Sequence, residues 1–143
     1  MEPHGNLVHV IRQLELALRP RFADACAAHA MTAAQCTAVM VLQQSPGITS
    51  SELARRSFVR AQTMADTLEP LVDAGLVRRE RDPRHGRRML LSLTERGVAA
   101  VTELAPAMAG IEGLLLSDLS PAERVALADY LGRCRRAVDR AGR

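Results

Sequence analysis

The densest group of charged residues in the sequence lies between positions 78 and 88, in the stretch RRERDPRHGRR. It holds six arginines and two acidic residues, a local net charge of +4, whereas the whole chain of 143 residues carries only +3. The positive charge is therefore local, which is the pattern of an electrostatic footprint for a partner rather than of general solubility. All 19 basic residues are arginine, so the choice of arginine over lysine is uninformative, but the position of the charge is not.

Other residue types that could do chemistry are sparse. The four histidines are scattered and no serine stands in a nucleophile-elbow context, so we expect no enzyme. Cys26, His29 and Cys36 have a spacing that a metal could use, but no fourth ligand is evident, so we expect structural cysteines, no metal and no cofactor. Three cysteines are few, and an odd number cannot all pair, so the sequence indicates reduced cytosolic thiols rather than a disulfide framework.

The composition favours a helical protein without a membrane segment. Apolar residues make up 48% of the chain but aromatic residues only 2%, so the core must be built from Leu, Val, Ala and Met. No apolar run approaches the roughly 18 residues of a membrane span, and the N-terminus lacks the features of a secretion signal. We therefore expect a cytoplasmic protein that does not associate with membranes.

Periodicity and capping signals define the elements that must position the arginines. They predict helices over 7–28, 33–44, 51–57, 60–74, 95–116 and 121–140. Thr32 with Gln35, Thr49 with Glu52, and Ser120 with Glu123 have the spacing of capping boxes. Pro20 should kink or interrupt the first helix, while Pro106, Gly110 and Gly113 predict weak spots in the fifth.

The arginine cluster falls on a predicted β-hairpin, with Pro83–Gly86 as its turn, directly after the fourth predicted helix. A short helix, a tight turn, a second helix and a basic hairpin together describe a winged helix-turn-helix within a mainly α protein. In such a fold the second helix can enter the major groove of DNA, and an arginine-bearing ribbon can reach the minor groove. The outward face of the helix predicted over 60–74 carries Arg60, Gln62, Thr63, Asp66 and Thr67.

The stretch SELARRSFVRAQTMADTLEPLVDAGLVRRERDPRHGRRMLLSLTERG resembles the MarR family of transcriptional regulators. The matching pieces are the ELA start of the helix-turn-helix, the LVDAGLV end of the second helix, and a wing of the form Asp-Pro-x-x-x-Arg followed by an apolar strand and LTERG. The resemblance covers about residues 49–97, and the flanking helices fit only by their placement.

The resemblance implies roles for individual residues. Gln62, Thr63 and Thr67 take the base-facing places, while Arg84 and Arg87 take the wing places that reach the minor groove. Thr49 and Ser50 take phosphate contacts at a helix N-terminus. Asp82 is the structural acid that orients the wing arginines, and Gly86 belongs to the turn of the wing.

Three residues depart from the family pattern. His85 stands where the wing usually has a second acid, which would weaken the internal pairing of the tip or make it sensitive to pH. Arg60 stands where the helix often begins with a capping Asp, so a cap is lost and a phosphate contact is gained. Pro70 lies inside the helix and removes the hydrogen bond to the Asp66 carbonyl.

A homodimer follows from both the physics and the resemblance. One helix reads only a few base pairs, whereas two helices related by a two-fold axis reach successive major grooves and read a palindrome. We therefore assign 1–30 and 98–143 to dimerisation and 31–97 to the DNA-binding domain. Apolar stripes in the terminal helices would form the seam; they comprise Leu7, Val10, Ile11, Leu14, Ile111, Leu114, Leu115, Val125, Leu127, Leu131 and Val138.

The resemblance also implies a repressor, in a bacterial cytoplasm and on the nucleoid when bound, that a small aromatic or phenolic ligand releases from a palindromic operator. By topology, Phe22, Cys26, His29 and Met40 would line the ligand pocket, although a lining of this kind is also what an ordinary core looks like. One alternative is a thiol-based redox sensor that uses Cys26. An alternative of another class is a winged helix that binds protein and no DNA.

Overall fold

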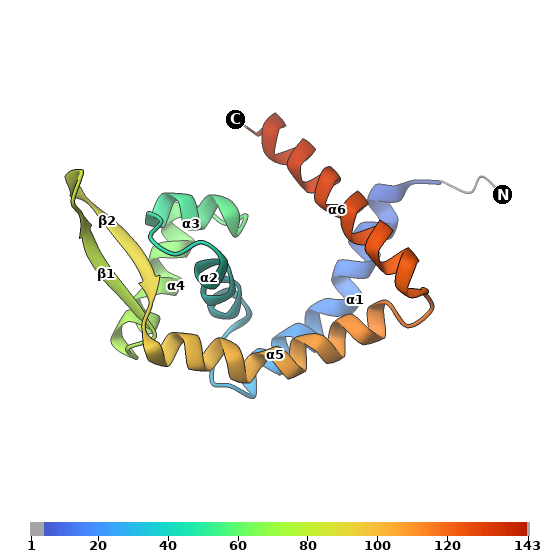
Figure 1. Ribbon diagram of the computed structural model, residues 1–143, viewed down its shortest axis with the longest axis horizontal. Helices are drawn as coiled ribbons and strands as arrows, with labels where there is room; N and C mark the ends of the chain where they lie inside the picture. The colour runs from blue at the N-terminus through green and yellow to red at the C-terminus, as the bar shows by residue number, and fades with distance from the viewer. Residues whose placement is uncertain (1–4, 143) are drawn as a thin grey trace. The chain divides into compact units, whose positions relative to one another are not determined.

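The computed structural model describes residues 5–142 and is mainly α-helical, as the sequence predicts (Figure 1). Residues 1–4 and 143, at the ends of the two expected dimerisation segments, lie outside the described part. The elements are α1 (Leu7–Ala27), α2 (Ala33–Gln44), α3 (Ser50–Arg56), α4 (Ala61–Asp73), β1 (Val77–Asp82), β2 (His85–Leu93), α5 (Glu95–Leu115) and α6 (Pro121–Ala141). Their order is that of a winged helix-turn-helix between terminal helices, which confirms the predicted fold class.

The chain forms two compact units that divide between Met108 and Ala109. The first unit contains α1 to α4, the hairpin and the N-terminal part of α5; the second contains the rest of α5 and α6. Helix α5 runs unbroken through the boundary. By packing, α1 and the first turns of α5 therefore belong with the winged part of the chain. Their assignment to a dimerisation domain concerns the assembly and remains a prediction.

The hydrophobic core lies in the first unit. Helices α2, α3, α4 and α5 and both strands contribute to it, and its fully buried larger residues are Leu42, Leu53, Met64, Leu68, Leu71, Leu91 and Leu104. Helix α6, in contrast, contributes no buried residue. The small-residue-rich helix α2 lies at the centre, where it packs against α1, α3, α4 and β2. This core holds the helix-turn-helix and the base of the wing in a fixed relation.

Helix starts follow the capping signals, with one exception. Thr32 with Gln35 and Ser120 with Glu123 form complete capping boxes at the starts of α2 and α6. At α3 the Thr49 hydroxyl accepts from the Glu52 N–H at 3.2 Å, but the Glu52 carboxylate does not return to the cap. The reciprocal box predicted there is wrong, because two arginines on the next turn of the helix take that carboxylate.

The prolines do not interrupt their helices. Helices α1, α4 and α5 run unbroken through Pro20, Pro70 and Pro106, so the interruption predicted at Pro20 does not occur. All three prolines lie on exposed faces, where water can satisfy a carbonyl that has lost its intrahelical donor. Helix α5 also continues through Gly110 and Gly113, its other predicted weak spots.

Helix α5 is also the one helix in residues 5–142 whose length and composition would allow it to cross a membrane. Its most apolar 18-residue window has a mean hydropathy of 1.4. This is weak evidence for a span, because Gly97, Val101 and Leu104 of the same helix are buried against the winged part of the chain. The sequence prediction of no membrane segment missed the apolar character of α5. Most of this apolar window is uncovered in a single chain.

The wing is an antiparallel hairpin of β1 and β2 that projects beyond α3 and α4 (Figure 1). The register is regular from Val77↔Leu93 to Arg81↔Met89 and then shifts, so that Asp82 pairs with His85. Only Pro83 and Arg84 form the turn, which is shorter than the predicted four-residue turn, and β2 already begins at His85. A single bridge from Ile48 to Leu91 ties the loop before α3 to the wing.

Candidate nucleic-acid interface

Helix α4 presents a polar face to solvent and an apolar face to the core. Met64, Leu68 and Leu71 are buried, and their spacing of four and three residues defines the inner face. The helix ends in a Schellman motif at Gly75, which has φ +74, with the Leu76 N–H bonded to the Leu71 carbonyl at 2.9 Å. It begins at Arg60, whose side chain makes no capping hydrogen bond, as the sequence predicts.

The predicted base-facing residues of α4 differ in exposure and in the hydrogen bonds that their side chains already make. Gln62 and Thr63 are exposed, although the Gln62 amide donates to an Asp66 carboxylate oxygen at 3.1 Å. Thr67 is half-buried and its hydroxyl donates to the Thr63 carbonyl at 2.7 Å. Gln62 and Thr63 are therefore better placed than Thr67 to meet a base edge, and the exposed Asp66 is a further acceptor on the same face.

Thr49 and Ser50 lie at the start of α3 and are both half-buried. Because the Thr49 oxygen already accepts from the Glu52 N–H, its own O–H remains available to donate to an anion. This geometry is compatible with the predicted phosphate contacts.

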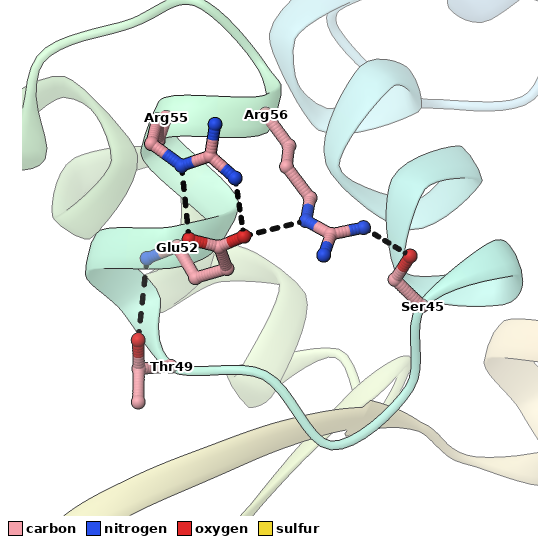
Figure 2. A network of polar contacts seen from close by, with 5 residues as sticks. All are labelled: Ser45, Thr49, Glu52, Arg55 and Arg56. Carbon is pink, nitrogen blue, oxygen red and sulfur yellow. Dashed lines mark hydrogen bonds and ion pairs between the residues drawn. The ribbon is translucent and has the colours of Figure 1, made fainter. Parts of the chain in front are cut away.

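A polar network fixes α3 against the end of α2 (Figure 2). The Arg55 guanidinium holds the Glu52 carboxylate with two hydrogen bonds of 3.0 and 2.6 Å, and Arg56 adds a third at 2.8 Å. Arg56 also donates to the Ser45 hydroxyl at 2.7 Å, which ties the first helix of the motif to the helix before it. The network therefore positions the helix-turn-helix, and within it two arginines pair with a single carboxylate.

The same arginines lower the pKa of Glu52 from 4.5 to about 2, first through the Arg55 hydrogen bonds and then through Arg56. Between these pH values the unfolded chain binds a proton that the folded chain does not. The stability that Glu52 contributes is therefore present above about pH 4.5 and is lost as the pH falls toward 2. We expect Glu52→Gln to lower the melting temperature near neutral pH, and the difference from wild type to shrink as pH falls through this window.

Thermal melts at pH 7, 5, 4 and 3 measure this difference. Asp118→Asn, which removes the same charge from an exposed residue outside the network, is the control. A Glu52→Gln difference that stays constant from pH 7 to pH 3 would contradict the role assigned to the carboxylate.

The wing arginines fall into two groups. Arg78 pairs with Glu80 at 3.1 Å and Arg79 pairs with Glu69 of α4 at 3.2 Å, so both are neutralised close to the body of the domain. Arg81 donates to the Gly86 carbonyl at 3.4 Å. Within residues 5–142, the exposed Arg84, Arg87 and Arg88 have no ion pair. The uncompensated charge of the hairpin is thus concentrated at its tip.

The two residues predicted to shape the wing behave differently from each other. Asp82 accepts from the backbone N–H of Arg84 at 2.9 Å, so it positions that arginine through the main chain and not through the guanidinium. Gly86 has ordinary backbone angles, and a Cβ added there would meet nothing within 4 Å. The sequence places Gly86 in the turn of the wing, but the turn closes two residues earlier, at Arg84, and this position does not require glycine. His85 is exposed and stands across from Asp82.

A surface hollow of about 610 Å³ brings the start of α3 and the wing tip together. Thr49 and Glu52 line it from the helix side, and Asp82, Arg84 and Arg88 line it from the wing. The structure therefore unites two of the predicted contacts, Thr49 and Arg84, on one surface. Sequence reasoning missed Arg88; the only available signal was its membership of the arginine cluster.

Cys26 and Cys36 lie together in the core, whereas Cys134 is exposed. Cys26 and Cys36 are fully buried and hydrogen-bond to one another, and burial raises the pKa of both thiols. A redox sensor needs an accessible thiol with a lowered pKa, so the predicted thiol switch at Cys26 is contradicted by the burial of its sulfur. No group of three or more metal-ligating side chains gathers anywhere in residues 5–142.

The residues predicted to line a ligand pocket lie in or against the core. Cys26 is part of the core, and Phe22 and Met40 are half-buried against it. His29 is half-buried with its Nδ1 3.1 Å from the Ala25 carbonyl. Their packing is that of an ordinary core, and their part in ligand binding remains a prediction.

The fold and this surface define a winged helix-turn-helix protein with a basic wing. Residues 30–88 match the sequence model of the MarR family. An HTH-type transcriptional repressor of Mycobacterium tuberculosis is 31% identical over 114 residues, which are 80% of this chain and 82% of the relative. The chain belongs to the MarR family, whose members are transcriptional regulators and not enzymes.

Solved structures agree with this assignment. A Mycobacterium tuberculosis MarR family protein in complex with salicylic acid is similar with a TM-score of 0.74 and 27% identity, over 94% of this chain and 99% of that one. The transcriptional repressor CouR bound to a 23-mer DNA duplex is similar with a TM-score of 0.77 and 25% identity, over 90% of this chain and 92% of that one.

Proposed function

We propose that this protein is a homodimeric repressor that binds a palindromic operator, with α4 in the major groove and the tip of the wing in the minor groove. The observation that carries the proposal is the unpaired charge at the wing tip, on the same unit as the exposed Gln62 and Thr63 of α4. The arginine-bearing hairpin that follows α4 suits the minor groove, where the negative potential of DNA concentrates. The DNA-bound state of the similar CouR supports the same use of the fold.

Uncovered apolar surface supports the dimer. In the first unit, α1 exposes Leu7, Val8, Val10, Ile11, Leu14 and Leu16. In the second unit, α5 and α6 expose Leu114, Leu115, Val125, Leu131 and Val138. A monomer rarely leaves so many large apolar side chains in water, so a second copy of the chain is the natural cover. Ile111 and Leu127 of the predicted seam are half-buried within the single chain.

Val125 offers a direct test of the dimer, because its side chain is 72% exposed in the single chain. Val125→Glu should cost a monomer almost nothing, but at a dimer seam it would bury a charge without a partner. We expect sedimentation analysis to show dimer for the wild type and a shift to monomer for the variant, with at least a tenfold loss of DNA affinity. Gln44→Glu, an exposed site on α2 with the same charge change, should remain dimeric.

We propose further that a small aromatic or phenolic ligand releases the protein from DNA. The similar structures with salicylic acid and with p-aminosalicylic acid support this class of effector. A ligand bound beside Phe22, His29 and Met40 would change the separation of the two wings and take the dimer off its half-site spacing. The protein would act in the bacterial cytoplasm, and on the nucleoid while it is bound.

Selection of duplexes from a random library by the wild-type protein, followed by footprinting, tests the operator proposal. We expect an inverted repeat with half-sites about one helical turn apart, about 34–36 Å between centres. Salicylate added to the complex should release the selected duplex. Failure to enrich any duplex would contradict the regulator and favour a winged helix that binds protein.

A further inference from the structure

The turn between α3 and α4 contains an aromatic residue in a strained backbone conformation. Phe58 has φ +55, in the left-handed region that L-residues with large side chains rarely adopt. Its side chain is 66% exposed. It is one of two phenylalanines in the chain, and its ring faces water although its backbone is in an unfavourable conformation.

Packing does not explain the ring. The turn is held by main-chain hydrogen bonds, from the Phe58 N–H to the Arg55 carbonyl at 3.2 Å and from the Val59 N–H to the Ala54 carbonyl at 3.0 Å. Val59 packs against the core, whereas Phe58 does not. The preceding Ser57 adds a second cost, because its hydroxyl is buried without a hydrogen-bond partner in the described part of the chain. The two main-chain bonds form a Schellman motif that ends α3, so the helix cap accounts for the positive φ but not for a phenylalanine at a position where glycine is usual.

The ring lies next to the surface that would meet DNA. Phe58 precedes Arg60, the N-cap of α4, by two residues, and the exposed Gln62 and Thr63 follow on the first turn of the helix. In a helix-turn-helix the first helix crosses the DNA backbone and the N-terminus of the second enters the major groove. The turn between them therefore sits at the edge of the groove, among the exposed Arg56 and Arg60.

We propose that Phe58 is a DNA-contacting residue whose ring packs on the apolar surface at the edge of the major groove; this inference rests on the proposed operator binding. Two groups offer that surface: the C5-methyl of thymine and the carbon face of deoxyribose. Contact with a thymine methyl adds sequence preference, and contact with deoxyribose adds affinity alone. The basic residues around the turn position the backbone, and the ring fills the space between them.

Phe58→Gly separates this role from a structural one, because glycine adopts a positive φ freely. We use the duplex that wild type selects from a random library, and measure its Kd and the melting temperature of each variant. The variant should melt no lower than wild type, while its Kd rises about fivefold or more. The salt dependence of Kd should not change, because no charge is removed. Ala30→Gly, which relieves a φ of +58 in the turn before α2, should leave Kd unchanged.

Deoxyuridine in place of each thymine of the selected duplex distinguishes the two sources. Weaker binding of wild type but not of Phe58→Gly at one substituted position identifies a methyl; loss in the Phe58→Gly variant with no sensitive thymine identifies deoxyribose. An unchanged Kd for Phe58→Gly overturns the proposal, even if the variant is more stable. If wild type itself enriches no duplex, the operator function fails first and the Phe58 contact fails with it.

Discussion

Replacing Arg84 and Arg87 together by alanine should raise the Kd for the selected duplex by at least tenfold in the dimer, with no loss of folding. Both side chains are exposed and unpaired in the described chain, so their removal strands no partner inside the protein. Single contacts of this kind contribute about 1–3 kcal/mol. Fluorescence anisotropy with a labelled duplex at fixed salt measures the change.

The matched control removes the same charge from the base of the same hairpin. Arg78→Ala with Arg79→Ala deletes two arginines that Glu80 and Glu69 already neutralise, so we expect a change of only a few fold. Equal losses in the two double variants would mean that only the net charge of the hairpin matters. No loss in the Arg84/Arg87 variant would remove the wing tip from the contact surface.

Gly97→Ala should have the largest effect on the fold of any glycine-to-alanine change between positions 47 and 142. A Cβ at Gly97 would lie 2.1 Å from the Leu76 carbonyl oxygen and 3.2 Å from the Leu93 Cβ. The carbonyl cannot give way easily, because it accepts from the Thr94 N–H at 3.1 Å. The Thr94 hydroxyl, which accepts from the Gly97 N–H, in turn donates to the Gly75 carbonyl at 2.5 Å. Helix α5 would have to separate from the base of the wing.

Overpacking of this kind costs about 1–3 kcal/mol or more, so we expect a fall of about 10 °C in melting temperature or failure to fold. Gly110→Ala, on the same helix with open space around it, should melt at or above the wild-type temperature. Gly86→Ala, at the wing, should also melt close to wild type. A Gly97→Ala protein as stable as these two would contradict the close approach of α5 to the wing.

Local signals in the sequence predicted the elements well. Thr32 and Ser120 each start a helix through a complete capping box, and Gly75 ends one at a positive φ. These features depend on neighbours a few residues away, so the sequence contains all that determines them. Pro20 does not interrupt α1, because an exposed helix face tolerates one missing hydrogen bond.

Features that depend on distant neighbours could not be predicted. The pairing of Arg79 with Glu69 joins a strand to a helix, and only the fold shows that this arginine is neutralised. The accessibility and the pKa of the Cys26 thiol depend on the core around it, so only the fold shows that this thiol is buried. Glu52 is a local exception: its carboxylate could pair with the helix cap or with Arg55 and Arg56, three and four residues away, and it pairs with the arginines.

The residues of the predicted site differ in how accessible the structure leaves them, and their contacts with DNA remain a prediction. Thr63, Arg84 and Arg87 are exposed, and Gln62 is exposed but donates to Asp66, whereas Thr67 is half-buried and its hydroxyl is engaged within its own helix. Arg88 joins the surface through the hollow that it lines with Thr49. The positive φ at Phe58 was missed because the signal for such a helix cap is a glycine, and a phenylalanine stands there.

The salt dependence of DNA binding tests the central claim most directly. Kd for the selected duplex, measured by anisotropy from about 50 to 200 mM salt, should rise steeply, by about a thousandfold if six or more phosphates are contacted. The slope of log Kd against log salt should be shallower for the Arg84/Arg87 double variant than for the Arg78/Arg79 variant, because the wild-type tip arginines neutralise phosphates. A wild-type Kd that is insensitive to salt, or equal slopes for the two double variants, would contradict DNA binding through the wing tip.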